Sequence, residues 1–342
     1  MRPPCEQLVE VGWSTPRMAQ DRRRGHGWVH VRAIVIRNAR VEVDPRVRGA
    51  SLRGGTQPGS HDDHAAWYNA GMRFGLDVAQ QRMPWREVAR RARFADDLGF
   101  DGVWGFDHFQ PMYGEGPGEC FEGNTTLAAW SGITSRVRLG LLVTGMTYRH
   151  PSVFAAEAIT IDHASGGRLE LGYGAAWFDK EHRELGIAFP ELGARVDAFE
   201  EAVQVVRGLL TTDRFTFEGR HFTVRDATLL PRPVQQPHPP IWIGASGEHR
   251  MMPIAARYAD VWHCFGPPEV LGPKSERLSA MADAAGRDPA SIMRASSCSL
   301  EGDLDGLARE IDAWASAGFD YLVGGWPSQG AERVEAFARR YL

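Results

Sequence analysis

The sequence predicts an α/β fold, a (β/α)8 TIM barrel with small insertions that begins near Met72. From Arg73 onward, short apolar runs rich in β-forming residues alternate with longer amphipathic stretches, and eight such runs are present. Alternation in this number favours a closed barrel over an open sheet. The segment 72–342 is also close to the roughly 250 residues that one such barrel needs.

The eight candidate strands are separated by polar loops and helical patterns. They are residues 73–78, 102–106, 137–143, 168–174, 241–244, 260–264, 292–297 and 321–324. The clearest helical pattern, Trp85–Leu98, has Val88, Ala92 and Ala95 near one face. Gly99 follows it, at the position where helices commonly end.

Two stretches interrupt the regular alternation. Residues 213–228 alternate apolar and polar side chains around Glu218-Gly219, which predicts a small hairpin. Residues 231–240 contain five prolines and can form neither a helix nor an inner strand. We expect a rigid connection into the fifth strand.

Residues 1–71 form a different kind of sequence, rich in arginine and poor in hydrophobic periodicity. We interpret this segment as a disordered extension that precedes the domain 72–342. It is either a basic arm for nucleic acid or a partner protein, or a stretch translated from a misplaced start. We favour the second interpretation, because MRFGL at Met72 opens the first convincing strand and acidic residues dilute the basic arm.

Composition limits the classes of partner. The formal net charge of −4 provides no broad basic field for nucleic acid, and no apolar run approaches the ~18 residues of a membrane-spanning helix. The four cysteines form no CxxC pair, so they suggest neither a zinc site nor a disulfide framework. We therefore expect a small-molecule substrate, no metal, and a location in the reducing cytoplasm.

Active sites of (β/α)8 barrels lie at the C-terminal ends of the strands, so the residues after each strand deserve inspection. The second strand ends in GFDHFQP, which places Asp107 and His108 at this rim. An imidazole there can exchange a hydrogen bond or a proton with a ligand ring, although a lone histidine can also be a solvated or core residue.

The fifth strand is followed by a turn of small residues, Gly244-Ala245-Ser246-Gly247, which opens a helix. Exposed backbone N–H groups at such a place form an anion site, and a loop of this kind in the C-terminal half of a barrel is a recurrent phosphate cradle. An ordinary tight turn has the same composition, so both readings stay open.

Several ordered motifs together resemble the bacterial luciferase-like superfamily, especially its coenzyme F420-dependent branch. They are MRFGL, LGFDGVWGFDHF, RVRLGLLVTGMTYRHP, ASGGRLELGYGAAWF, EHRELGI and PPIWIGASGEHRMMPIAARYAD. The resemblance runs from Met72 to about Leu342.

The resemblance implies a flavin or deazaflavin at the barrel mouth. It also implies a non-prolyl cis peptide at Leu142-Val143 behind the ring, where a plain core strand is the alternative. The ring or its ribityl chain would approach the glycine-rich turn at Gly174 and Ala175, and the loop 244–247 would bind the cofactor's phosphate. We therefore expect the chain after Phe106, Val143, Gly174 and Gly244 to converge on one site.

The same resemblance suggests roles for the polar residues. His108 would transfer a proton or bond the ring, and Asp107 would contact the deazaflavin. Trp177 and Glu181 would line the substrate side. Sugar-phosphate dehydrogenases of this branch carry a glutamate after the fourth-strand glycines, where we place Trp177, so we expect a different substrate. Family analogy suggests a homodimer.

The sequence thus predicts a coenzyme F420-dependent oxidoreductase that transfers a hydride between the deazaflavin and a small organic substrate. One alternative is an FMN-dependent luciferase-like monooxygenase, and another is a non-catalytic flavin-binding barrel. A metal-dependent hydrolase using His108, His150, His163 and His263 is disfavoured. Such enzymes need a His-x-His pair after the first strand, and this chain has Asp77-Val78-Ala79-Gln80 there.

Overall fold

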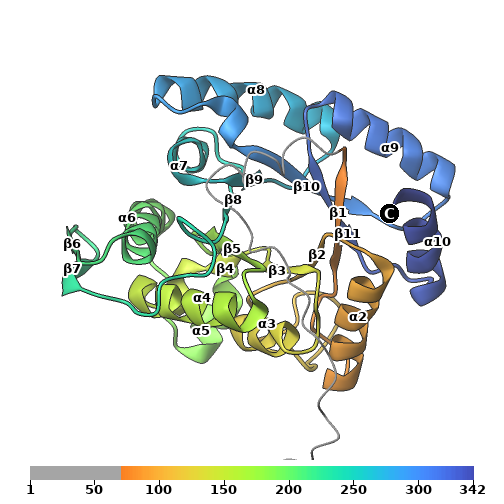
Figure 1. The fold of residues 1–342 in the computed structure, drawn as a ribbon, viewed down its shortest axis with the longest axis horizontal. Helices are drawn as coiled ribbons and strands as arrows, with labels where there is room; N and C mark the ends of the chain where they lie inside the picture. The colour runs from red at the N-terminus through yellow and green to blue at the C-terminus, as the bar shows by residue number, and fades with distance from the viewer. Residues whose placement is uncertain (1–70) are drawn as a thin grey trace, which may run out of the picture. The chain divides into compact units, whose positions relative to one another are not determined.

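The computed structural model describes residues 71–342, and within them a closed parallel barrel surrounded by helices (Figure 1). The barrel strands are β1 (Arg73–Asp77), β2 (Gly102–Gly105), β3 (Arg138–Leu141), β4 (Thr144–Gly145), β5 (Leu169–Gly174), β8 (Ile241–Gly244), β9 (Val261–His263), β10 (Met293–Ser299) and β11 (Tyr321–Gly325). They are hydrogen-bonded in the order β3-β2-β1-β11-β10-β9-β8-β5-β4, and pairing of β3 with β5 closes the ring. The predicted TIM-barrel fold is confirmed.

The third strand position is shared by β3 and β4, which are separated by two residues. The peptide bond between Leu142 and Val143 is cis, as the resemblance implied. On the far side of it, Thr144 and Gly145 pair with the end of β5. Both halves therefore pair with the same neighbour, and the chain bulges between them.

The helices follow the strands in the expected alternation. They are α2 (Trp85–Leu98), α3 (Gly123–Ser131), α4 (Pro151–Ser165), α5 (Asp179–Leu185), α6 (Leu192–Thr211), α7 (Met251–Tyr258), α8 (Pro268–Ala284), α9 (Leu304–Ser316) and α10 (Ala331–Tyr341), with short 3-10 turns Met146–Tyr148 and Pro289–Ser291. Helix α2 has the predicted bounds, and Gly99 ends it with φ of 94°, a conformation that glycine adopts without strain.

The two interruptions also take the predicted form. Strands β6 (Phe215–Glu218) and β7 (Thr223–Ala227) make an antiparallel hairpin beside α6 (Figure 1). The carboxylate of Glu201 on α6 anchors its turn by accepting from the N–H groups of Arg220, His221 and Phe222. Residues 231–240 contain no helix or strand before β8 begins.

Two apolar clusters hold the barrel. One lies between the strands and the helices, and the other consists of side chains inside the barrel. Inside, the rings of Trp104 and Trp242 lie 4.2 Å apart between centroids, and Tyr321 meets both edge to face. A Cβ at Gly140 would lie 2.2 Å from the Trp104 ring, so a glycine here makes room for the indole.

The predicted extension 1–71 falls almost wholly outside the described residues. Its boundary with the barrel domain 72–342 stays a prediction.

Gly172→Ala should destabilise the barrel, because a Cβ there would lie 1.8 Å from the carbonyl oxygen of Leu141. Backbone must move to relieve this contact, and we expect a loss of about 3 kcal/mol in the free energy of unfolding by urea. Gly132→Ala is the matched control, because its nearest neighbour would be 3.8 Å away. A loss at Gly172 as small as that at Gly132 would contradict this account.

Candidate active site

His108 is held at the end of β2 by a buried carboxylate. Its Nδ1 lies 2.5 Å from Oε1 of Glu181, and Oε2 of the same carboxylate accepts from the backbone N–H of Phe109 at 2.9 Å. The hydroxyl of Tyr148 also donates to Glu181. The side chain of Glu181 has no exposed surface and that of His108 has very little. Two other chain segments, which carry Tyr148 and Glu181, therefore fix the imidazole.

This contact decides which nitrogen of His108 can react. Burial opposes the charge of Glu181, but the hydrogen bonds from His108, Tyr148 and Phe109 outweigh it, so the pKa of Glu181 lies below its ordinary value. An ionised carboxylate only accepts hydrogen bonds, so Nδ1 must carry the proton. Nε2 is then the nitrogen that can take a proton from a ligand or return it.

The neighbouring Asp107 has a different environment. Its carboxylate receives two hydrogen bonds from Arg149, at 2.5 and 3.0 Å, and one from the N–H of Gly145 at 3.3 Å. Arg149 also pairs with Glu122 and Glu157. Burial opposes the charge of Arg149, yet the bonds and charge of Asp107 outweigh it and raise the pKa of Arg149. Asp107 therefore joins the end of β2 to the end of β4 and to Arg149.

Gln80 fixes the end of β2 from the other side. Its amide nitrogen donates to the carbonyl of Phe106 at 2.5 Å, and its amide oxygen accepts from the N–H of the same residue at 3.2 Å. Gln80 is fully buried. The backbone that carries Asp107 and His108 is thus pinned on both sides.

The side chain of Val143 lies over Gly174 of β5 and Gly244 of β8. A Cβ at Gly174 would approach its methyl Cγ2 to 2.6 Å, and one at Gly244 to 3.4 Å. The hydrogen bond from Gly145 to Asp107 joins the second strand to this group. The chain after Phe106, Val143, Gly174 and Gly244 does converge at one end of the barrel. We name Val143, Gly174 and Gly244 the glycine platform.

The loop Gly244–Gly247 continues from this platform. Ala245 is buried, and its N–H donates to the carbonyl of His263 at 3.1 Å, whereas Ser246 and Gly247 are exposed. Lys274 places its Nζ 3.0 Å from the carbonyl of Ser246. Nearby, Arg277 pairs with Glu248. Lys274 Nζ also lies 3.9 Å from Glu248, so two cationic side chains and one carboxylate flank an exposed turn of small residues.

Three polar side chains extend the interior of the barrel toward the same end. Side chains two residues apart on a strand share a face. Asp77 therefore lies on the same face as Gly75, His263 on the same face as Val261, and Ser297 on the same face as Ala295. The interior position of these preceding residues is shown by their packing around Trp104 and Tyr321. His263 is buried, its Nε2 lies 3.2 Å from the Ser297 hydroxyl, and burial lowers its pKa to about 4.

Trp177 and Glu181, both expected on the substrate side, occupy contrasting places. Trp177 is 66% exposed, and its ring meets the His108 ring edge to face at 5.8 Å. Glu181 lies behind His108 and presents no surface of its own. Of this pair, Trp177 alone has a surface that a ligand could touch.

The sequence pointed to His182 and Tyr148 near the site, as lining residues, but did not predict their contacts. His182 is fully buried, with Thr147 and the carbonyl of Phe178 as hydrogen-bond partners, and its ring stacks on Tyr148. Tyr148 and His182 occur in the motifs TYRHP and EHRELGI that carry the family resemblance. Their presence there was the available signal, but nothing in the spacing of these motifs shows that they meet.

The four histidines of the hydrolase alternative are used separately. His150 caps the N-terminus of α4, His163 contacts the carbonyl of Arg232, and the other two have the partners described above. Within residues 71–342, no group of three or more His, Cys, Asp or Glu side chains is arranged to hold a metal ion.

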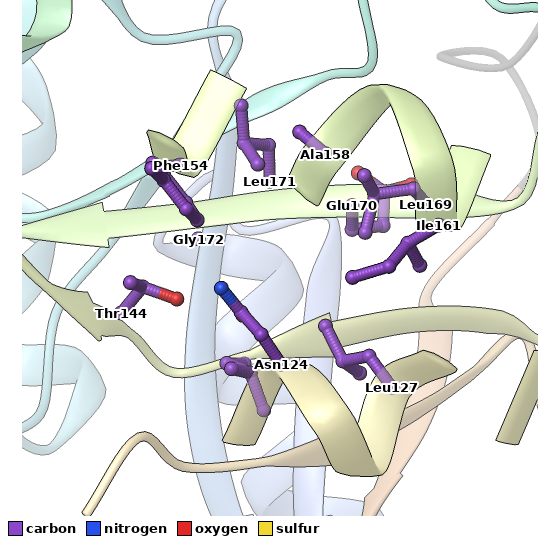
Figure 2. Close-up of a pocket in the computed structure, with 11 residues that line it drawn as sticks. Asn124, Leu127, Thr144, Phe154, Ala158, Ile161, Leu169, Glu170, Leu171 and Gly172 are labelled. Atoms are coloured by element: carbon purple, nitrogen blue, oxygen red, sulfur yellow. The ribbon is translucent and has the colours of Figure 1, made fainter. Parts of the chain in front are cut away.

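A small cavity lies between the barrel wall and the helices α3 and α4 (Figure 2). Leu127 of α3, Phe154 and Ile161 of α4, and the backbone around Gly172 line it, with Asn124 and Thr144 at one side. Asn124 already donates to Glu157 at 2.6 Å. The cavity is mostly apolar and separates two helices from the strands, so we treat it as a packing defect of the wall.

Comparison with known proteins agrees with this geometry. A family model described as luciferase-like monooxygenase matches residues 66–333. The chain belongs to the luciferase-like monooxygenase family. A solved F420-dependent secondary alcohol dehydrogenase, in complex with an F420-acetone adduct, superposes on this luciferase-like chain with a TM-score of 0.72 and 20% identity. The match covers 79% of this chain and 98% of the other, and it shows the fold.

Curated relatives of this luciferase-like protein include F420-dependent dehydrogenases and a pyrimidine monooxygenase. It is 34% identical over 189 residues to F420-dependent glucose-6-phosphate dehydrogenase of Microbacterium testaceum. The aligned region covers 55% of this chain and 54% of the relative. It is also 34% identical over 178 residues to pyrimidine monooxygenase RutA of Cronobacter sakazakii, with 50% and 51% covered. The chain therefore matches about half the length of these relatives.

The helices of this luciferase-like barrel, as far as the structure describes them, are all too short or too polar to cross a membrane.

Asp77→Asn should change how stability depends on pH. Burial raises the pKa of Asp77 to about 6, although the N–H of Ala79 donates to it. Because an unfolded aspartate ionises near pH 4, wild type should lose stability as pH rises from about 4 to 6. Asparagine cannot ionise and keeps the acceptor oxygen. We therefore compare the free energy of unfolding of Asp77→Asn with that of wild type at each pH. This difference should be more favourable to the variant at pH 8 than at pH 4, by up to about 2 kcal/mol.

Urea unfolding at the two pH values measures this difference. Asp97→Asn is the control, because Asp97 is exposed on α2. An equal pH response of the two variants would show that Asp77 ionises as freely as a surface carboxylate.

Proposed function

We propose that this protein is a coenzyme F420-dependent oxidoreductase that transfers a hydride between the deazaflavin and a small organic substrate. The observation that carries the proposal is the buried Glu181–His108 pair at the same barrel end as the glycine platform and the loop Gly244–Gly247. The proposal is supported by relatives whose names state F420-dependent dehydrogenase activity.

The residues present fit such a cofactor. In the glycine platform the side chain of Val143 fills the space over Gly174 and Gly244, so a flat ring would approach the methyl groups of Val143. Leu142, Val143, Gly174 and Ala175 would contact the ring and ribityl region. The exposed N–H groups of Ser246 and Gly247, with Gly244 and Ala245 leading into them, would bind the phosphate beside Lys274.

Within this proposal, the bound deazaflavin supplies the hydride chemistry. The protein supplies placement and proton transfer. His108 takes or returns the accompanying proton through Nε2, because Nδ1 is occupied by Glu181. Glu181 is a positioning residue, in the role that the third member of a catalytic triad plays toward its histidine. Asp107 would act on the ring site through Gly145 and Arg149, which it holds.

The main alternative is an FMN-dependent monooxygenase, and the similarity to pyrimidine monooxygenase RutA favours it. A non-catalytic flavin-binding barrel would need the same platform but no reactive histidine. The Glu181–His108 pair is therefore the feature that argues for an enzyme. We further propose a cytoplasmic location and a homodimer, as expected from the cysteine content and from family analogy.

The cofactor is tested by equilibrium binding of purified protein to F420 and to FMN, followed by fluorescence quenching. We expect F420 to bind at least tenfold more tightly. Tighter binding of FMN would favour the monooxygenase. Binding of neither would remove the basis for the oxidoreductase.

The proton-transfer role is tested by His108→Asn and Glu181→Gln in single-turnover hydride transfer with reduced F420 and a panel of carbonyl acceptors. Loss of a general acid or base costs typically 10²–10⁴-fold in rate. We expect a loss in that range for His108→Asn, with the Kd for F420 changed less than threefold. Glu181→Gln should lose less and should shift the pH optimum of the rate.

A purely structural role for Glu181 would leave the pH profile in place while lowering the Tm. Lys180→Gln, an exposed change on the same helix, is the control and should keep both rate and pH profile. Full activity of His108→Asn would eliminate our assignment of the proton-transfer residue.

A further inference from the structure

Tyr148 and His108 contact the same oxygen of a buried carboxylate. The hydroxyl of Tyr148 and Nδ1 of His108 both donate to Oε1 of Glu181, while Oε2 accepts from the backbone N–H of Phe109. The hydroxyl also lies 3.5 Å from Nδ1 itself. A tyrosine hydroxyl carries one proton, and here the carboxylate receives it. The two side chains therefore compete for the negative charge on one atom.

The direction of the tyrosine hydrogen bond is fixed. Burial raises the pKa of Tyr148 well above its ordinary value, and the bond to Glu181 and the charge of that carboxylate raise it further. Burial opposes the ionisation of Glu181, but its hydrogen bonds outweigh this effect and lower its pKa. At neutral pH the hydroxyl of Tyr148 is therefore the donor and the carboxylate of Glu181 the acceptor.

The ring of Tyr148 is held without help from its hydroxyl. It stacks on the buried ring of His182 at 4.7 Å between centroids and meets Phe109 edge to face at 5.0 Å. Gly145 adds a constraint, because a Cβ there would lie 2.5 Å from the tyrosine ring. His182 is fixed in turn, with its Nε2 2.6 Å from the hydroxyl of Thr147. Replacing Tyr148 with phenylalanine should therefore remove one hydrogen bond and keep the packing.

The other titratable groups around this pair are neutral, paired or exposed. Burial and the charge of Glu181 raise the pKa of the Cys120 thiol to about 12, so the thiol is neutral at pH 7. Asp107 is paired with Arg149, and both ring nitrogens of His182 have hydrogen-bond partners. Charged side chains that are exposed to solvent on α5 and in the loop after β2 are Asp179, Lys180, Arg183, Glu184, Glu115 and Glu119. The direct contacts of Glu181 therefore dominate the field at His108.

We propose that Tyr148 is a second positioning residue of this site, whose hydroxyl competes with His108 for Oε1 of Glu181 and thereby sets how readily Nε2 of His108 takes up a proton. Its role in catalysis rests on the proposed oxidoreductase function, whereas the coupling itself does not. An imidazolium is stabilised by negative charge that faces Nδ1, and a second donor on the same oxygen withdraws part of that charge. Tyr148 and Glu181 therefore act on His108 in opposite directions.

This opposition suits a group that must both take and return a proton. A general acid or base is most effective when it exchanges its proton near the operating pH. A buried carboxylate alone would make the imidazole hold its proton too firmly, because nothing would reduce the charge beside Nδ1. The hydroxyl of Tyr148 moderates that effect and leaves Nε2 of His108 free for exchange.

The test follows His108 in the cofactor-free protein by nitrogen-15 NMR, which distinguishes the two ring nitrogens and their protonation as the pH is changed. Tyr148→Phe should move the protonation midpoint of His108 up by about 0.5–1 pH unit, because the carboxylate loses one donor. Glu181→Gln should move it down by about one unit or more, because the negative charge is lost. A midpoint that is unchanged or lower in Tyr148→Phe would overturn the proposal.

Tyr341→Phe is the matched control. It also removes a tyrosine hydroxyl, but one that donates to the carbonyl of Leu304 on α9, 2.9 Å away. This variant should leave the midpoint of His108 unchanged. A shift equal to that of Tyr148→Phe would show that loss of any tyrosine hydroxyl has this effect, against the proposal.

A second substitution at position 148 keeps the hydroxyl. Site-specific 3-fluorotyrosine has a more acidic phenol and is a stronger donor, so the midpoint of His108 should fall below that of wild type. A rise with both phenylalanine and 3-fluorotyrosine would assign the change to altered packing rather than to the hydrogen bond, and would overturn the proposal.

Single-turnover hydride transfer with F420 then connects the coupling to catalysis. In Tyr148→Phe the pH dependence of the rate should shift in the direction and by the amount seen by NMR. If the midpoint moves but wild type transfers no hydride, the proposed function fails and the coupling stands. If wild type transfers hydride and the midpoint does not move in Tyr148→Phe, the role of Tyr148 fails alone.

Discussion

The buried carboxylate of Glu181 organises the chemical part of this barrel. It receives hydrogen bonds from the imidazole after β2, from the backbone N–H of Phe109 and from the hydroxyl of Tyr148. An ionised group without exposed surface is stable only when such donors replace its hydration. The three donors must stay in place for Glu181 to remain ionised, and the ionised carboxylate in turn holds the donors in place. The orientation of His108 follows from that mutual dependence.

The apolar side of the site depends on close approach of backbones. The carbonyl of Leu141 and the side chain of Val143 occupy space that any side chain at positions 172 or 174 would need. Glycine is required there by contact distance, because it leaves room for the Leu141 carbonyl and the Val143 side chain. The backbone constraint of the barrel wall therefore also fixes where Val143 lies at the barrel mouth.

The sequence by itself determined the fold, because eight β-rich runs, amphipathic helices and Gly99 each encode local structure within a few residues. It also placed Asp107, His108 and the loop Gly244–Gly247 at strand ends, because barrel topology fixes where those ends lie. Only the tertiary structure paired His108 with Glu181, 73 residues away along the chain. Likewise, it alone buried His263 and brought its Nε2 to the hydroxyl of Ser297. Burial and contacts between distant segments arise from packing, which no local pattern in the sequence records.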